Sequence, residues 1–181
     1  DVNGDGLLDI TVGNHGGLSP LWMVNGVDIA DSSIGLPTSA PLLASLTGVT
    51  PITAPARLTD ADLQVVAQVA INAWQATGLT AAESARLNAV TFQIADLGNV
   101  LGLAGSRTVM IDDDGAGLGW STALAAVDPD RFDLLTVIAH ELGHVLGRAD
   151  ALPNQSANNV MQSLLHPGER HLDGLLAALD V

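Results

Sequence analysis

Cysteine and tyrosine are both absent from the 181 residues, and basic side chains are scarce. Without cysteine the chain forms no disulfide, and no thiolate of its own can keep a metal site latent. Six basic residues stand against 20 acidic ones, giving a formal net charge of −14. That charge argues against nucleic acid or an anionic membrane as partner, and no apolar run is long enough to span a bilayer. It fits a secreted or cell-surface protein that binds calcium.

The length and the 48% hydrophobic content allow one domain of ordinary size, or a small domain with an appendage. Prolines spaced among serine, threonine and small apolar residues predict a linker over 37–56, with room for one short strand. This linker separates a segment of 1–36 from a larger domain of 57–181. Because the sequence begins inside a motif at Asp1, we expect the chain to be part of a larger multidomain protein.

Oxygen-bearing side chains recur at the start of the chain in a pattern typical of calcium loops. The expected ligands are Asp1, Asn3, Asp5 and Asp9, with Gly6 at the sharp turn. Val12 stands where an EF-hand has a bidentate glutamate, so the loop is not a complete EF-hand. A solvated turn rich in aspartate and glycine is the alternative interpretation.

A short strand over 10–12 and a hairpin over 21–29 are expected next. Asn25-Gly26 is the dipeptide preferred in two-residue hairpin turns. With the calcium loop, the segment resembles one FG-GAP/VCBS-type repeat of the kind found in the propellers of surface proteins. A single blade cannot close a propeller.

The domain of 57–181 begins with helical signals. Thr59-Asp60 predicts the start of a helix that ends near Thr77, and Thr80 to Glu83 is a capping-box pattern for a second, short helix. Alternating residues predict a strand over 89–95, and 108–111 is expected to be another. Residues 97–105 read as irregular. A terminal helix is predicted over 172–179.

Three adjacent carboxylates, Asp112, Asp113 and Asp114, follow the second of these strands. Like charges so close together repel, and a bound cation would stabilise them. A second calcium site and a plain solvated turn are equally compatible with this sequence.

The stretch around His140, Glu141 and His144 carries the strongest chemical signal, because it forms the pattern H-E-x-x-H. Residues four apart lie on one face of a helix, so both imidazoles can reach one metal ion. Glu141 is placed to take a proton from a metal-bound water. The helix is expected to begin at Asp128, Pro129 or Asp130, with proline at a first helical position.

Catalytic zinc usually has three protein ligands and one open position, so a third ligand is required. Gly147 predicts the end of the helix in a left-handed turn, after which Asp150 can return toward the metal. His166, Glu169 and His171 are alternative third ligands that would need a longer loop to return.

The extended pattern H-E-x-x-H-x-x-G-x-x-D resembles the metzincin zinc peptidases, and is closer to matrixin- or snapalysin-like members. The usual family pattern has His at the last position, and Asp there resembles the snapalysin-type variant. Asn158 to Met161 resembles their methionine turn, in which Met161 lies beneath the metal. The resemblance implies an α+β fold: a zincin with a twisted mixed β-sheet, a backing helix, an active-site helix and a C-terminal helix. It also implies that 97–105 is the edge strand that pairs with an extended peptide.

The resemblance implies a zinc-dependent endopeptidase that acts on a protein or peptide substrate. A zinc-bound water would attack the peptide bond, with Glu141 as general base and His140, His144 and Asp150 as ligands. Astacin- and serralysin-like members place a tyrosine after the turn methionine, but here Gln162 follows Met161. The alternative function is a non-catalytic calcium-binding module of a large bacterial surface protein, with a structural or vestigial zinc site.

Overall fold

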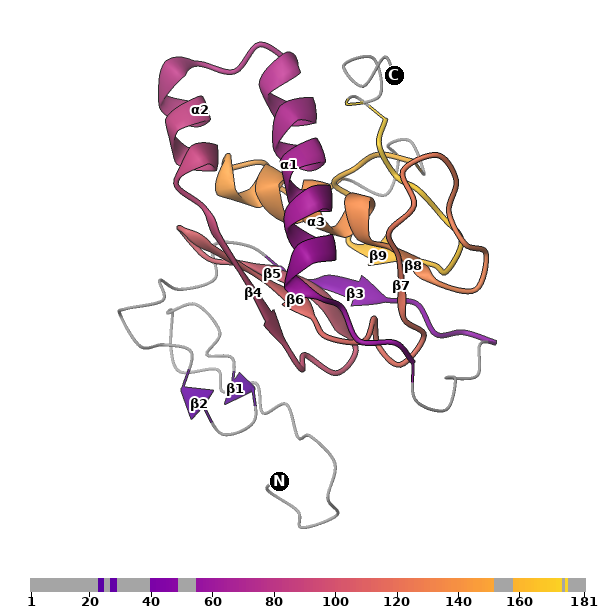
Figure 1. Ribbon diagram of the computed structural model, residues 1–181. Coiled ribbons are helices and arrows are strands. Elements are labelled where there is room, and N and C mark those ends of the chain that lie inside the picture. The colour runs from indigo at the N-terminus through magenta and orange to yellow at the C-terminus, as the bar shows by residue number, and fades with distance from the viewer. Residues whose placement is uncertain are drawn as a thin grey trace. The chain divides into compact units, whose positions relative to one another are not determined.

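The computed structural model describes residues 23–24, 27–28, 40–48, 55–151, 158–173 and 175. The chain divides into two compact units, Asp1–Leu36 and Pro37–Val181. In the first unit, β1 (Met23–Val24) and β2 (Val27–Asp28) pair antiparallel, which confirms the expected pairing of strands within 21–29 (Figure 1). The turn expected at Asn25-Gly26 lies outside the described residues. The proposed calcium ligands Asp1, Asn3, Asp5 and Asp9, and the strand expected over 10–12, lie outside the described residues.

The second unit begins with two capped helices, α1 (Asp60–Ala76) and α2 (Ala81–Asn88). The side chain of Thr59 accepts a hydrogen bond from the Asp62 N–H and caps α1. At α2, Thr80 and Glu83 bond reciprocally to each other's backbone N–H, so the predicted capping box is confirmed. These two helices are therefore specified by short-range sequence signals.

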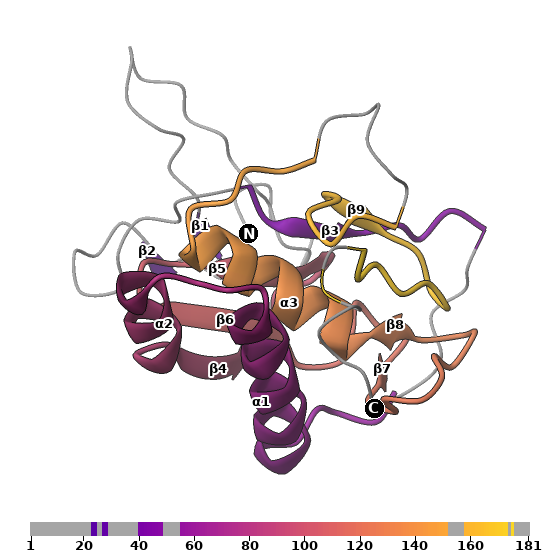
Figure 2. The same ribbon diagram turned by 90° about the horizontal axis from the view of Figure 1, so that it is seen from above.

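The strands of the second unit form a five-stranded mixed sheet in the order β4-β6-β5-β3-β9. The pairs β4–β6 and β3–β9 are parallel, whereas β6–β5 and β5–β3 are antiparallel. The helices α1, α2 and α3 lie over one face of this sheet (Figures 1 and 2). The strands are β3 (Leu42–Ala44), β4 (Thr91–Ala95), β5 (Val100–Ala104), β6 (Thr108–Asp112) and β9 (Leu164–Leu165).

Two expectations for the sheet are wrong. Residues 97–105 are not an irregular edge, because β5 is a regular strand with β6 on one side and β3 on the other. The neighbour β3 comes from 37–56, where a linker with room for one short strand was expected. The short strand is confirmed, but it belongs to the sheet and not to a linker. Its three residues gave too short a pattern to reveal this partner.

The helix that carries H-E-x-x-H is α3 (Leu134–Val145), and it begins later than expected. Phe132–Asp133 forms β8, which pairs in parallel with β7 (Trp120–Ser121), so Pro129 is in a turn outside the helix. The N-cap is Asp133, whose side chain accepts the Thr136 N–H. The predicted start at 128–130 is therefore wrong.

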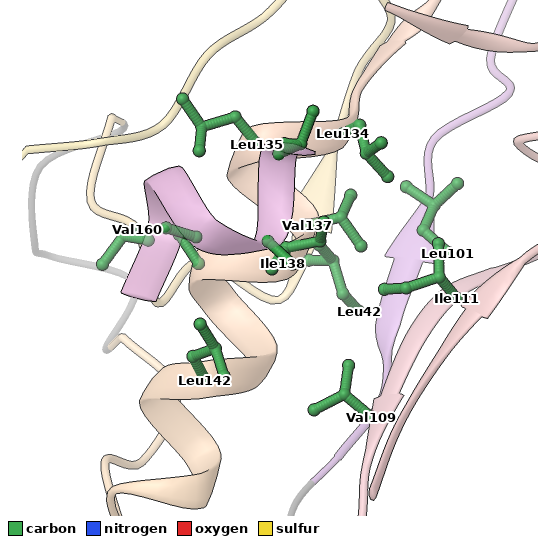
Figure 3. Packing of buried hydrophobic residues seen from close by; sticks show 14 of the residues in the cluster. Leu42, Leu101, Val109, Ile111, Leu134, Leu135, Val137, Ile138, Leu142 and Val160 are labelled. Atoms are coloured by element: carbon green, nitrogen blue, oxygen red, sulfur yellow. The ribbon is translucent and has the colours of Figure 1, made fainter. Parts of the chain in front are cut away.

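The hydrophobic core lies between the sheet and the helices, and every residue of α3 is buried. Figure 3 shows side chains of this cluster from β3, β5, β6 and α3. Trp74 of α1 is also in the core, and its indole N–H donates to the Ala139 carbonyl at 2.9 Å. A helix this deeply buried gives its polar residues no access to water, so each of them needs a partner within the protein or a bound ligand.

The C-terminal segment departs from the expected helix of 172–179 where it is described. Leu172 and Asp173 are not helical, and Asp173 forms an isolated bridge with Asn159. In the described part of the chain, no helix combines the length and the apolar character needed to cross a membrane.

Candidate metal centre

His140, His144 and Asp150 bring three ligand atoms to one point. The two Nε2 atoms lie 2.9 Å apart, and Asp150 Oδ1 lies 3.2 Å from His144 Nε2 and 3.6 Å from His140 Nε2. Metal–ligand distances of about 2.0–2.1 Å in a tetrahedral zinc site separate the ligand atoms by about 3.3 Å. The three atoms therefore have nearly the spacing that one zinc ion requires.

Backbone carbonyls fix the orientation of both imidazoles. His140 Nδ1 bonds to the Val160 carbonyl at 2.9 Å, and His144 Nδ1 bonds to the Arg148 carbonyl at 2.9 Å. Since a carbonyl can only accept, each Nδ1 carries a proton, and the two Nε2 atoms face each other at 2.9 Å. A cation placed between the two Nε2 atoms could bind both of them.

Charge and burial at the cluster also fit a metal. Burial lowers the pKa of His140 to about 3, with a further contribution from His144, so its imidazole is in the neutral form that binds metal. Asp150 Oδ1 is buried and accepts no hydrogen bond. A buried carboxylate oxygen without a donor is costly unless a cation lies beside it.

The end of α3 returns the chain to the cluster. Gly147 has φ +82°, its N–H donates to the His144 carbonyl at 2.8 Å, and the Arg148 N–H donates to the Gly143 carbonyl at 2.9 Å. This is the Schellman arrangement that ends many helices. The predicted left-handed turn at Gly147 is confirmed, and it places both the Arg148 carbonyl and Asp150 at the cluster.

Met161 packs against Gly143 of α3. A Cβ on Gly143 would collide with Met161 Sδ, so this helical position has no room for a larger residue. The Ala151 N–H donates to the Met161 carbonyl at 2.7 Å, and this bond ties the chain next to Asp150 to the turn. The turn also supplies the Val160 carbonyl to His140, so it orients two of the three ligands.

Glu141 is buried beside the cluster without a hydrogen-bond partner on either carboxylate oxygen. Its pKa is raised to about 8, chiefly by burial and also by the negative charge of Asp150. The backbone of Leu42 and of Ala104 opposes this shift, although neither forms a hydrogen bond of ordinary geometry with the carboxylate. A Cβ on Gly102 of β5 would lie 2.8 Å from Glu141 Cγ. Glycine in a strand often marks such a close approach, and sequence reasoning missed this signal.

The alternative third ligands do not join the cluster in the described structure. His171 Nε2 lies 3.1 Å from Glu169 Oε2, and the same carboxylate oxygen accepts the His166 backbone N–H. His171 is still close enough to lower the pKa of His140. Among the four residues considered, Asp150 is thus the one whose oxygen meets both Nε2 atoms.

The acidic run after β6 is only partly brought together. Asp112 and Asp113 converge with Asp96, whereas the Asp114 carboxylate accepts the Gly117 N–H. Asp96 follows β4 directly, and the parallel pairing of β4 with β6 explains why it meets Asp112.

Protein groups already satisfy two of these carboxylates. Asp112 accepts N–H groups of Leu97 and Ala116 at 2.7 and 2.8 Å, although burial raises its pKa to about 6. Asp113 forms an ion pair with Arg57. The cluster is therefore compatible with the absence of a cation.

Sequence reasoning also missed an ion pair between the partly buried Arg170 and the buried Asp133 at the start of α3. Arg170 donates from Nε and a terminal nitrogen to the two carboxylate oxygens of Asp133 at 2.9 and 2.8 Å. The His171 N–H donates to Thr136 Oγ1 at 2.9 Å. These bonds fix the segment after Met161 to the first turn of α3. Arg170 and Asp133 are 37 residues apart in the sequence.

Comparison with protein-family models and with curated proteins yields no match to this sequence. The function is therefore argued from the geometry of the centre.

Proposed function

We propose that the unit Pro37–Val181 is a zinc-dependent endopeptidase of the metzincin type. The observation that carries the proposal is the cluster of His140, His144 and Asp150 with the buried carboxylate of Glu141 next to it. A structural metal site has no use for an unpaired buried carboxylate, since burying one is costly. A general base at a catalytic centre does need such a group.

The residues of the chain have separate roles in this reaction. His140, His144 and Asp150 hold the metal, and the carbonyls of Val160 and Arg148 orient the two imidazoles. A bound zinc ion supplies Lewis acidity, which lowers the pKa of water and polarises a carbonyl group. The positive charge also favours the ionised form of Glu141, in opposition to the burial that raises its pKa to about 8.

Glu141 takes the proton from the attacking water and passes it to the leaving amine. No tyrosine is available to stabilise the developing negative charge, so the remaining donors are backbone N–H groups and other side chains. The proposed substrate is a peptide in extended conformation, which would need a free strand edge near the centre. In the structure β5, the strand next to Glu141, is paired on both sides.

Glu141→Ala tests the mechanism directly. The variant is expected to bind one zinc per chain and to lose peptidase activity on a mixed peptide library analysed by mass spectrometry. Glu169→Ala is the matched control, because Glu169 is half-exposed and does not join the metal group. Cleavage by the Glu141→Ala variant at the wild-type rate would refute the role of Glu141.

A non-catalytic surface module with a structural zinc site is the second candidate function. The burial of His140, Glu141 and His144, with no side chain of α3 exposed, favours it. Four protein ligands around the metal, with no position left for water, would support this function over a peptidase.

A further inference from the structure

Strand β3 is held between two strands by bonds on both of its sides. It pairs antiparallel with β5 through Leu42–Gly102 and parallel with β9 through Leu43–Leu164. The Leu43 N–H donates to the Ser163 carbonyl at 3.1 Å, and the Ala44 N–H donates to the Asn99 carbonyl at 3.0 Å on the opposite side. A three-residue segment is thus bound chiefly through its main chain.

The position of β3 would suit a separate peptide. If β3 left the sheet, β5 and β9 would each present unpaired backbone groups across a gap one strand wide (Figures 1 and 2). Exposed strand edges bind extended peptides through main-chain hydrogen bonds, and alternate side chains give the specificity. The antiparallel register with β5 is irregular between Leu42 and Leu43.

Leu42 connects β3 to the proposed general base. Its register partner in β5 is Gly102, where an added Cβ would lie 2.8 Å from Glu141 Cγ. The Leu42 side chain is 1% exposed and belongs to the same buried cluster as Val137 and Ile138 of α3 (Figure 3). By contrast, Leu43 is 44% exposed. The main chain of β3 and the buried side chain of Leu42 therefore lie where a peptide substrate would have to bind.

We propose that residues 41–46 are an intramolecular pseudosubstrate that occupies the peptide-binding position between β5 and β9 and must leave it before a substrate can bind. This inference rests on the proposed peptidase function and adds the kind of ligand that the centre binds. The ligand is an extended peptide that inserts a large aliphatic side chain at the place of Leu42. The segment both blocks the centre and displays the preferred sequence.

The test measures peptide binding separately from cleavage. A fluorescein-labelled peptide with the sequence of residues 41–46, Pro-Leu-Leu-Ala-Ser-Leu, is titrated with full-length Glu141→Ala protein and followed by anisotropy. Leu42→Asp in the same background places a charge in the core and expels β3. Binding at least tenfold tighter than in the parent is expected. Val65→Asp, at an exposed position of α1, is the matched control and should leave binding unchanged.

A reversible staple provides a second measurement that does not depend on the Leu42→Asp variant folding. Leu43→Cys with Leu164→Cys joins β3 to β9, because the two residues are register partners and the chain has no other cysteine. Peptidase activity should be lost when the pair is oxidised and should return on reduction. Equal and measurable peptidase activity in both states would overturn the proposal, as would unchanged peptide affinity in a folded Leu42→Asp variant.

The two proposals fail in different ways. If the chain is not a peptidase, no variant cleaves peptides, but the labelled peptide still binds more tightly once β3 is displaced. If residues 41–46 are a permanent strand, the protein with Leu43→Cys and Leu164→Cys still cleaves peptides when the staple is closed. Peptide binding and cleavage together therefore separate the two claims.

Discussion

The variant Gly102→Ala tests the contact between β5 and the proposed general base. A Cβ at this position would lie 2.8 Å from Glu141 Cγ and 2.9 Å from Val137 Cγ1. Carbon atoms in good contact are about 3.5–4.0 Å apart, so the helix or the strand would have to move by about 0.7 Å or more. Strand β5 is bonded on both sides and α3 is buried, so neither yields freely. Overpacking of this kind costs about 1–3 kcal/mol.

Urea denaturation of the variant should show this loss in the free energy of unfolding. Activity should fall more steeply, since displacing a catalytic group by about 1 Å can cost about 100-fold in rate. In a Glu141→Ala background, the same glycine substitution should cost less, because the side chain that Cβ would meet is gone. The difference is a coupling energy of about 0.5–3 kcal/mol. Equal costs in the two backgrounds would show that the Glu141 side chain does not lie against β5.

Three further predictions concern the metal ligand Asp150, the pH dependence of stability and the ion pair of Arg170 with Asp133. Asp150→His should still bind zinc, because imidazole is an equally good ligand, and complete loss of zinc by mass spectrometry would contradict the role of residue 150. For metal-free protein, the pKa of Glu141 is raised from 4.5 to about 8, so its folded form binds the proton more tightly than its unfolded form. Its contribution to stability is therefore complete below pH 4.5 and is lost as the pH rises to about 8, at about 1.4 kcal/mol per pH unit. Glu141→Gln should reduce the dependence of stability on pH, measured by thermal melts in the presence of chelator. An unchanged pH dependence would show that other groups cause it. Arg170→Ala leaves Asp133 buried without its cation and should cost about 3 kcal/mol in urea denaturation, whereas a change within error would show that the pair adds little.

The parts of the structure that were predictable are those encoded over short distances. The caps at Thr59 and Thr80 act within one helical turn, so their side chains reveal the helix starts directly. The metal cluster is also local, because His140 to Asp150 spans one helix end and one glycine turn. Spacing and the family resemblance therefore favoured Asp150, although His166, Glu169 and His171 stayed open as third ligands.

The parts that were missed depend on contacts between distant residues. Nothing near Leu42 indicates that it pairs with Gly102, and a three-residue strand has no readable period. Pro129 suits a first helical position, but pairing of Phe132 with Trp120 delays the start of α3. The ion pair of Arg170 joins residues 37 apart, and no local pattern marks it.

The most direct test of the account is an anomalous-scattering map at the zinc edge from crystals grown with zinc and calcium. The account predicts one zinc peak held by His140 Nε2, His144 Nε2 and Asp150 Oδ1, with a fourth position not filled by protein. No peak at these atoms would contradict the metal centre. A peak enclosed by four protein ligands would contradict the peptidase and support a structural site.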